Sequence, residues 1–474
     1  MTPTLRSLTA VLPLVLAACS AASDPSRPSG PSIVLVSLDT LRADRLGCYG
    51  HGRDTSPTLD RLAAEGVRFA DASAPSSKTA PSHMSMLSGL HPSVHGVVNF
   101  HAGEGTSAHP ELPYLPERLR AAGYRTAAFT GGGMVSGELG FARGFEVYDD
   151  AGGGADRVFA RGAEWLRRRA DGERPFFLFL HTYEIHDPYT PPEEWQARFV
   201  DPDYAGAVDS TRCELPVDAA EVWKRDPSFY FEIRNRFWKG FDREDPADLA
   251  HLRDLYDAGI AFTDHELGRF WGVVEELGLD GEVLLVVTSD HGDALGQHDN
   301  MSHHSVYQEI LHVPLIVRRP GGAGGGRVVR RPVQGVDLAA SLAELAGVEP
   351  PAPLQGRSWV ADLEGRETSP TPVWAELGSK ENELAAVRIG ADKLIRNRAT
   401  GAFELYDLAR DPHELTPDEA PGGEPAASLR AEMELRERQN DALGKRFPPG
   451  AAPLGEDALG PLQALGYAGE GSGE

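Results

Sequence analysis

The feature that most restricts the fold is a series of short apolar segments separated by longer amphipathic ones. The apolar segments read SIVLVSLD, GYRTAAFTG, PFFLFLHTYE, EVLLVVTSD and VPLIVRRP. Apolar runs of this length predict β-strands buried on both faces, as in a mainly parallel sheet covered by helices. The segments SPTLDRLAAEGVRF, ADRVFARGAEWLRRRA and LRDLYDAGIAFTDHELGRFWGVVEELG have helical spacing. The sequence therefore predicts an α/β fold with a large, mainly parallel sheet flanked by helices.

We expect this α/β domain to cover residues 31–348. Beyond it, TPVWAEL, LAAVRIGADKLIRNR and AFELYDL resemble successive strands joined by tight turns. They predict a small antiparallel sheet in a C-terminal subdomain, residues 349–474, with a frayed, Gly-rich end. Residues 201–246 interrupt the α/β pattern, and we interpret them as an insertion near the rim of the site. The aromatic residues of this insertion either line a substrate cleft or form its local core; they are Phe231, Phe237 and Trp238.

The N-terminal residues have the pattern of an export signal. One arginine precedes an apolar run that ends in small residues, which predicts a signal peptide over residues 1–18. LAAC resembles a bacterial lipobox, in which Cys19 would carry a lipid and residues 19–30 would form a tether; a plain secretory signal is the alternative. The expectation is an exported lipoprotein, held at the outer membrane and facing the periplasm or the surface. Sequence does not decide whether Cys48 and Cys213 pair.

The charge of the chain restricts its partners. With 46 Lys and Arg against 71 Asp and Glu, the net charge is −25. Such an acidic chain is not expected to bind nucleic acid.

Two predicted strands end in residues that commonly bind metals. Asp39 follows LVSL, and Asp290 and His291 follow LVVTS. Ligands gather at the carboxyl ends of parallel strands, and two carboxylates with an imidazole are a metal-ligand set. Asp39 alone could instead cap the next helix. The Asp290–His291 pair is costly to bury without a function, which favours a metal site.

The stretch SSKTAPSHMSMLSGLHP contains a candidate nucleophile, Thr79. We expect it at, or just before, the N-terminus of a helix that begins near Ser82. Free N–H groups and the helix dipole suit an anionic substrate there. A hydroxyl beside a divalent cation loses its proton more easily and can attack the substrate.

These segments together resemble the sulfatase family of the alkaline phosphatase superfamily. The matching segments read IVLVSLDTLRADRLGCYG, TSPTLDRLAAEGVRF, TAPSHMSMLSGLHPSVHGV, LRAAGYRTAAF, FFLFLHTYEIHDPYTPP, VVTSDHGDALGQHD, VPLIVRRPG and ELYDLARDPHE. They follow the family order over some four-fifths of the chain. The resemblance implies the same α/β fold and an ester hydrolase.

The resemblance also places Thr79 at the nucleophile position, with one departure. Sulfatases have Cys (or Ser)-x-Pro-x-Arg there, and the Cys or Ser is oxidised to formylglycine. This chain has Thr79 and, at the Arg position, His83. Threonine carries a methyl group on its β-carbon and cannot become an aldehyde, so no formylglycine is expected. Phosphodiesterases, phosphonate hydrolases and phosphoethanolamine- or phosphoglycerol-transferring relatives use a metal-bound Thr, or another direct nucleophile, at this position.

The metal ligands implied by the resemblance are Asp39, Asp290, His291 and the Thr79 oxygen. Sulfatases commonly have Asp-Asp at the first strand end and bind calcium, whereas this chain has Asp39-Thr40. Two carboxylates and one imidazole suit zinc or manganese better than calcium, which prefers six to eight oxygens. We expect one divalent ion, with calcium as the alternative.

The remaining candidates would handle protons and the anion. His186, in EIHDPY, matches a family histidine that contacts the substrate, and His303 is the candidate general acid, with His304 as a rival. The alternative for His303 and His304 is a surface pair on a polar loop. Lys78, with His83 and His304, would bind substrate, although Lys78 could instead be a solvated loop charge.

Four further polar residues are interpreted as structural. Asp293 and His298 are expected to shape the loop behind the metal, and Asp257 and Asp264 to face solvent.

The favoured function is a metal-dependent hydrolase of a sulfate, phosphate or phosphonate ester. A phosphorus ester is preferred because a sulfated threonine lacks the exit route of an aldehyde. One alternative is a phospho-headgroup transferase, although such enzymes usually carry several N-terminal membrane helices. The other is a non-catalytic binding lipoprotein on the same fold; retention of Asp39, Thr79, Asp290 and His291 argues against it.

Overall fold

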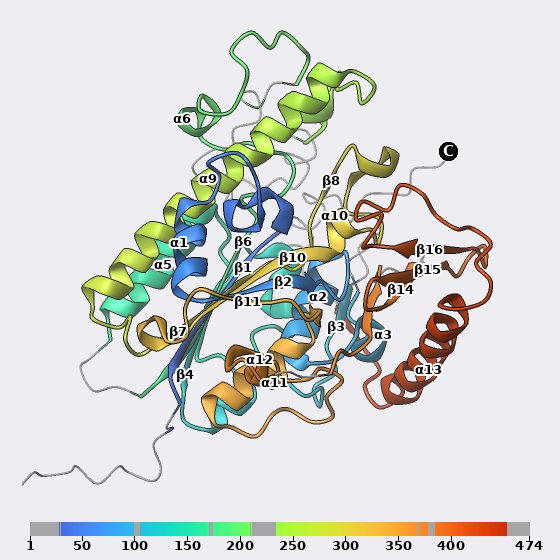
Figure 1. Cartoon of the computed structure of the whole chain (residues 1–474). Helices are drawn as coiled ribbons and strands as arrows, with labels where there is room; N and C mark the ends of the chain where they lie inside the picture. The colour runs from blue at the N-terminus through green and yellow to red at the C-terminus, as the bar shows by residue number, and fades with distance from the viewer. Residues whose placement is uncertain are drawn as a thin grey trace, which may run out of the picture.

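A computed structural model describes residues 28, 30–98, 105–169, 174–208, 210, 234–366, 369–377 and 384–452. Its centre is a nine-stranded sheet in the order β11-β2-β10-β7-β1-β6-β4-β5, with β12 paired to β2 (Figure 1). The strands are β1 (Ser32–Leu38), β2 (Val67–Ser73), β4 (Arg125–Phe129), β5 (Val147–Asp149), β6 (Phe176–Thr182), β7 (Val283–Thr288), β10 (His312–Arg318), β11 (Arg327–Val329) and β12 (Val333–Gln334).

The middle of the sheet is parallel. Strand β1 pairs in parallel with β6 on one side and β7 on the other, and Ser37 lies opposite both His181 and Thr288. Strand β10 runs antiparallel to its neighbours β2 and β7. The prediction of a mainly parallel sheet is confirmed, and the register brings the carboxyl ends of β1, β6 and β7 to one edge.

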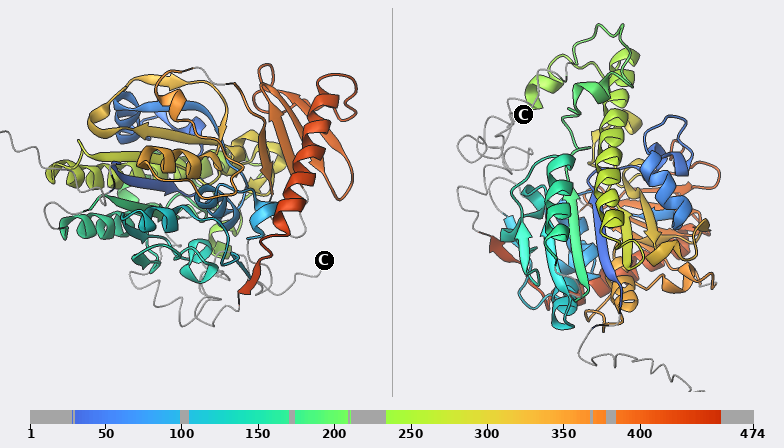
Figure 2. Two further views of the ribbon diagram at one scale, coloured as in Figure 1. Left: turned by 90° about the horizontal axis from the view of Figure 1, so that it is seen from below. Right: turned by 90° about the vertical axis from the view of Figure 1, so that its left-hand side faces the viewer.

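Helices cover both faces of the sheet, as the apolar strands require (Figure 2, right). In β1, Val34 and Val36 face one hydrophobic cluster, and Ile33 and Leu35 face the other. The first face is covered by α1 (Pro57–Glu65), α5 (Ala155–Arg167) and α9 (Pro246–Glu276). The second is covered by α2 (Thr79–Ser88), α3 (Pro92–His95), α4 (Leu115–Ala121), α11 (Asp337–Ala346) and α12 (Val360–Leu363).

A second sheet forms the C-terminal subdomain, as predicted. Its four antiparallel strands are β13 (Val373–Glu376), β14 (Leu384–Ile389), β15 (Asp392–Asn397) and β16 (Phe403–Asp407). Helix α13 (Ala426–Gly444) packs against it through Leu429 and Met433. The shorter elements are β3 (Gly105–Ser107), which pairs with β17 (Gly450–Ala452), β8 (Ala294–Leu295), which pairs with β9 (Met301–Ser302), and the one-turn helices α6 (Glu193–Gln196) and α10 (Gln308–Leu311).

Two boundaries differ from the sequence prediction. The helix predicted over SPTLDRLAAEGVRF ends at Glu65, and the residues from Val67 form β2 instead. A Cβ at Gly66 would meet the Val317 carbonyl oxygen at 2.6 Å, so the chain turns into the sheet where only glycine fits. Helix α2 begins at Thr79, three residues before the expected start, which places the candidate nucleophile in its first turn.

Some predictions lie outside the described residues. These are the signal peptide, the lipidation of Cys19, the packing of Phe231 and the pairing of Cys213. Phe237 is part of the hydrophobic cluster between the sheet and helices α1, α5 and α9, so it belongs to the core and not to a cleft wall. Within the part of the chain that the structure describes, no helix has the length and apolarity needed to cross a bilayer.

The prediction that Asp257 and Asp264 face solvent is wrong. Both are buried on α9 because they have specific partners. Asp264 accepts hydrogen bonds from the backbone N–H groups of Thr58 and Leu59, at 2.8 Å each, and so caps α1. Helical periodicity cannot distinguish an exposed acid from one that meets a partner from another element.

Asp257 supports a testable prediction about stability. Its carboxylate lies 2.9 Å from Arg53 Nη1 and 3.3 Å from both Arg45 Nη1 and His51 Nε2. Asp257→Ala leaves Arg45 and Arg53 without their buried partner, and we expect a loss of about 3 kcal/mol in the free energy of unfolding. Asp254→Ala, which removes a more exposed partner of Arg53, should cost less than about 1 kcal/mol. Urea unfolding of both variants measures the difference; equal losses would contradict it.

Candidate metal and anion site

Three predicted metal ligands meet at the carboxyl edge of the central sheet. Asp39 directly follows β1, and Asp290 and His291 follow β7, the strand beside it. All three side chains are fully buried. One ligand atom from each lies within 4.8 Å of the other two. The parallel pairing of β1 and β7 therefore assembles the cluster that the sequence predicted.

The electrostatics of this cluster fit a cation. Asp39 Oδ1 and Asp290 Oδ2 are buried, and neither has a hydrogen-bond partner among the residues that the structure describes. Burial, then repulsion from Asp290, raises the pKa of Asp39 well above its usual value, although a side-chain hydrogen bond with Thr79 opposes the rise. Two orphaned carboxylate oxygens beside an imidazole form a donor set for a divalent metal ion.

His181, which sequence reasoning missed, supports this cluster. It lies near the end of β6, and its Nδ1 accepts the Gly131 N–H at 3.4 Å. Its Nε2 therefore carries the proton and faces Asp39 Oδ2 at 3.3 Å. A histidine inside the apolar run PFFLFLHTYE was the signal that could have revealed it.

Thr79 lies beside the cluster, as predicted. It is fully buried in the first turn of α2, and its Oγ1 is 3.4 Å from His291 Nε2. Ser82 Oγ, one turn later, lies 2.8 Å from the carbonyl oxygen of Asp290 and joins α2 to the end of β7.

His83 is buried beside the cluster, with Nδ1 3.7 Å from Asp290 Oδ2. Its Nδ1 donates to the Thr79 carbonyl oxygen at 2.8 Å, and its Nε2 lies 2.9 Å from Ser37 Oγ. Both nitrogens therefore already have protein partners. These hydrogen bonds connect α2 to β1. Because both ring nitrogens are engaged, His83 has no free nitrogen for the predicted contact with substrate.

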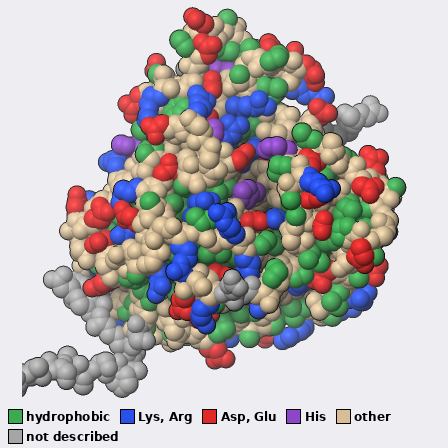
Figure 3. All heavy atoms as spheres, viewed as in Figure 1, with side chains coloured by type: hydrophobic (Ala, Val, Ile, Leu, Met, Phe, Trp, Pro, Cys, Tyr) green, Lys and Arg blue, Asp and Glu red, His purple; other side chains and the backbone are tan. Residues whose placement is uncertain are grey.

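A second group of side chains adjoins the metal cluster. His303 is buried, and its Nε2 faces His186 Nε2 at 3.3 Å. Lys78 Nζ lies 2.9 Å from His304 Nδ1 and 3.4 Å from His303 Nδ1. The rings of His303 and His291 are 4.4 Å apart, which joins this group to the metal cluster. In Figure 3, histidine side chains are visible at a hollow in the molecular surface.

The alternative readings of Lys78 and His303 are thereby excluded. Lys78 is 3% exposed, so it is not a solvated loop charge, and His303 is not on the surface, although His304 is exposed. Burial lowers the pKa of Lys78 to about 7 and, with the nearby lysine, lowers that of His303 well below the usual histidine value.

Two buried acidic residues lie near these histidines. Asp187 is paired with Arg234 at 2.9 Å, and Trp238 donates to the same oxygen at 3.0 Å. Asp293 accepts a hydrogen bond from Tyr189 at 2.7 Å, and burial, then Asp187, raises its pKa to about 7. Asp293 is buried close enough to the cluster for its charge to contribute to the raised pKa of Asp39.

With the fold and the cluster established, comparison with known proteins identifies the family. The sequence profile described as Sulfatase matches residues 31–348. The chain belongs to the sulfatase family. A second profile, N-sulphoglucosamine sulphohydrolase, C-terminal, matches residues 296–438. The chain is therefore a sulfatase-like ester hydrolase, and its cluster of Asp39, Asp290 and His291 agrees with the divalent metal that this family generally binds.

Individual relatives are similar over most of the chain. An N-acetylglucosamine-6-O-sulfatase of Bacteroides thetaiotaomicron is 24% identical, covering 86% of both chains. A protein solved with its substrate D-glucosamine-2-N,6-O-disulfate has a TM-score of 0.71 at 21% identity, covering 87% of this chain and 98% of that one. A phosphonate monoester hydrolase of Agrobacterium radiobacter has a TM-score of 0.68 at 21% identity, covering 87% and 96%. These structures share the fold.

The buried carboxylates lead to a prediction about metal and stability. Zinc or manganese added to the chelator-treated chain should raise its Tm by about 3 °C or more, because the ion binds the folded state only. Asp39→Asn should abolish this rise because it removes a ligand. Scanning calorimetry with and without each ion measures both effects, and an equal rise in the variant would contradict the ligand assignment.

Without metal, the same variant should behave differently. The folded-state pKa of Asp39 is raised above the unfolded value, so its stabilising contribution is present below about pH 4 and lost as pH rises through the folded pKa. Chelator-treated Asp39→Asn should therefore be at least as stable as the unaltered chain at pH 7.

Proposed function

We propose that this chain is a metal-dependent hydrolase that cleaves a sulfate, phosphate or phosphonate ester through the hydroxyl of Thr79, with a phosphorus ester favoured. The observation that carries the proposal is the position of Thr79 Oγ1. It is buried, in the first turn of a helix, 3.4 Å from His291 Nε2 and beside two carboxylates with unpartnered oxygens. A hydroxyl in such surroundings is suited to attack an anionic ester.

The nucleophile favours phosphorus over sulfur for a chemical reason. The Thr79 oxygen forms a bond to the central atom of the ester, and the bond to the leaving alcohol breaks. Water then attacks the same atom, breaks the bond to Thr79 and restores the hydroxyl. A sulfated threonine would depend entirely on this attack, because threonine cannot form the aldehyde hydrate that expels sulfate.

The histidines are placed to manage protons. His186 Nδ1 lies 2.7 Å from the Asp187 carbonyl oxygen and His303 Nδ1 3.0 Å from that of Ser77. Both Nδ1 atoms therefore donate, and the two Nε2 atoms face each other at 3.3 Å. Either Nε2 atom, when it carries a proton, would donate that proton to the leaving oxygen.

The other residues would hold the metal and the anion. Asp39, Asp290 and His291, with the Thr79 oxygen, would bind one divalent ion, zinc or manganese in preference to calcium. Such an ion would supply positive charge that lowers the pKa of the Thr79 hydroxyl and offsets the charge of the ester. Lys78 and the exposed His304 would contact the outer oxygens of the substrate. Similarity to a phosphonate monoester hydrolase and to sulfatases supports both ester classes.

The test is a matched panel of substrates for the full-length chain in detergent. It contains an aryl phosphate, an aryl phosphodiester, an aryl phosphonate monoester and an aryl sulfate, each with zinc, manganese or calcium. We expect highest kcat/KM on a phosphorus ester. Thr79→Ala should lower kcat by about 1,000-fold or more, because it removes the nucleophile, whereas Thr79→Ser keeps the hydroxyl and should retain part of the activity.

The other outcomes have definite meanings. Dominant sulfatase activity would contradict the preference for phosphorus, and Thr79→Ala with full activity would contradict the nucleophile. Transfer of the phospho-group to an added alcohol in place of water would favour the transferase. No turnover and no metal binding would favour the non-catalytic binding protein.

We also infer that the chain is exported and anchored by a lipid on Cys19. The support is the sequence pattern LAAC after an apolar run. In a bacterial host, labelled palmitate should enter the unaltered chain, and the chain should sediment with the outer membrane. Cys19→Ala should lose both the label and the sedimentation; retained sedimentation would contradict the anchor.

A further inference from the structure

The loop that carries His303 and His304 has an unusual backbone. We call residues 296–308 the His303 loop. Five non-glycine residues in the described chain have a positive φ, and three lie in this loop, at His298, Asp299 and Ser302. A fourth is Glu414, which contacts the loop from the C-terminal subdomain. Such backbone is costly and persists only where surrounding contacts hold it.

A buried ion pair from the C-terminal subdomain holds one end of the loop. Lys393 Nζ, from β15, lies 2.6 Å from Glu414 Oε1 and donates to the Val306 carbonyl oxygen at 2.7 Å. The other carboxylate oxygen of Glu414 accepts the Gln308 N–H at 2.6 Å. Both charged side chains are almost completely buried. The pair thus binds the backbone on both sides of Tyr307.

His298 fastens the earlier part of the loop to the same place. Its Nδ1 lies 2.8 Å from Glu309 Oε1, and its Nε2 lies 2.9 Å from the carbonyl oxygen of Glu414. Its ring stacks on Tyr307, with centroids 3.9 Å apart. His303 lies between these two attachments, and its ring meets Ser77 and His186 on the side of the active site.

We propose that Lys393 and Glu414 are positioning residues for His303, so that the C-terminal subdomain sets the geometry of the proton-handling pair. This rests on the proposed function, because the position of His303 affects turnover only if the site hydrolyses esters. Loss of one partner leaves a buried charge unpaired and releases the backbone that the pair holds. A shift of about 1 Å at a catalytic group can cost about 100-fold in rate.

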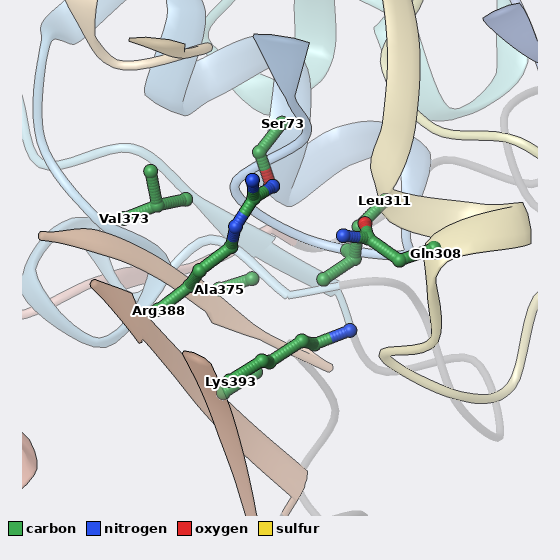
Figure 4. A pocket seen from close by; sticks show the side chains of 8 residues that line it. Ser73, Gln308, Leu311, Val373, Ala375, Arg388 and Lys393 are labelled. Carbon is green, nitrogen blue, oxygen red and sulfur yellow. The ribbon is translucent and has the colours of Figure 1, made fainter. Parts of the chain in front are cut away.

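The chain offers a matched control at the same junction. Arg388, on β14, pairs with Asp71 of β2, with Nη1 2.8 Å from Oδ1. This pair also joins the C-terminal sheet to the α/β domain, and its hydrogen bonds connect β14 with β2, outside the His303 loop. Figure 4 shows Arg388 and Lys393 at a small pocket between the two parts, with Arg388 directed toward Ser73 and Lys393 toward the side of Gln308.

The experiment measures amide hydrogen exchange and kinetics in the full-length chain in detergent. Glu414→Gln should speed exchange in residues 296–308 by about 10-fold or more and lower kcat/KM by about 10-fold or more, whereas Arg388→Met should change each by less than about 3-fold. If Glu414 acts through His303, the double variant Glu414→Gln/His303→Ala should be no slower than His303→Ala.

Several results would overturn the proposal. One is a kcat/KM in the double variant that is lowered by the product of the two single losses. Another is unchanged amide exchange in the loop of Glu414→Gln. The third is an equal loss of kcat/KM in Arg388→Met and Glu414→Gln when the two variants have equal free energies of unfolding. If Glu414→Gln does not fold, His298→Asn replaces it, because it removes both ring contacts at a half-buried position and must give the same pattern. Absence of ester hydrolysis in the unaltered chain would contradict the proposed function, while the exchange data would still decide whether the pair holds the loop.

Discussion

The site is built around two buried carboxylates at the ends of adjacent parallel strands. Asp39 and Asp290 repel each other in a dry setting, and one oxygen of each lacks a hydrogen-bond partner. Burying two acidic side chains without compensation costs stability, so stability alone does not account for their presence at this position. Together with the nearby imidazole of His291, these carboxylates form a group of side chains that could hold a metal ion.

The active-site architecture follows from that edge of the sheet. The parallel register aligns the ends of β1, β6 and β7, so Asp39, His181 and Asp290 arrive together. Helix α2 then brings Thr79 to the cluster, and its side chains Ser82 and His83 bond to the strand ends. His186 and His303 come from loops, and residues of the C-terminal subdomain contact the loop that carries His303.

Much of this could be predicted from local patterns, and the failures share one cause. Apolar runs revealed the central strands, and acids directly after them revealed Asp39 and Asp290. The start of strand β2 was missed because residues 67–69 were assigned to the predicted helix, which in fact ends at Glu65. Asp257 and Asp264 were predicted to face solvent, and a solvated charge was the alternative for Lys78, yet each is buried by partners more than 200 residues away. Periodicity carries no information about such partners.

The sequence by itself determined the class of fold, the strand ends that carry Asp39, Asp290 and His291, and the exclusion of an aldehyde at Thr79, because these depend on residue type and short-range spacing. Only the tertiary structure decided which histidines meet, that Lys78 is buried against His303 and His304, and that Glu414 reaches the His303 loop. The physical reason is that burial and electrostatic pairing are set by contacts between segments far apart in the chain, which only the packed fold brings together.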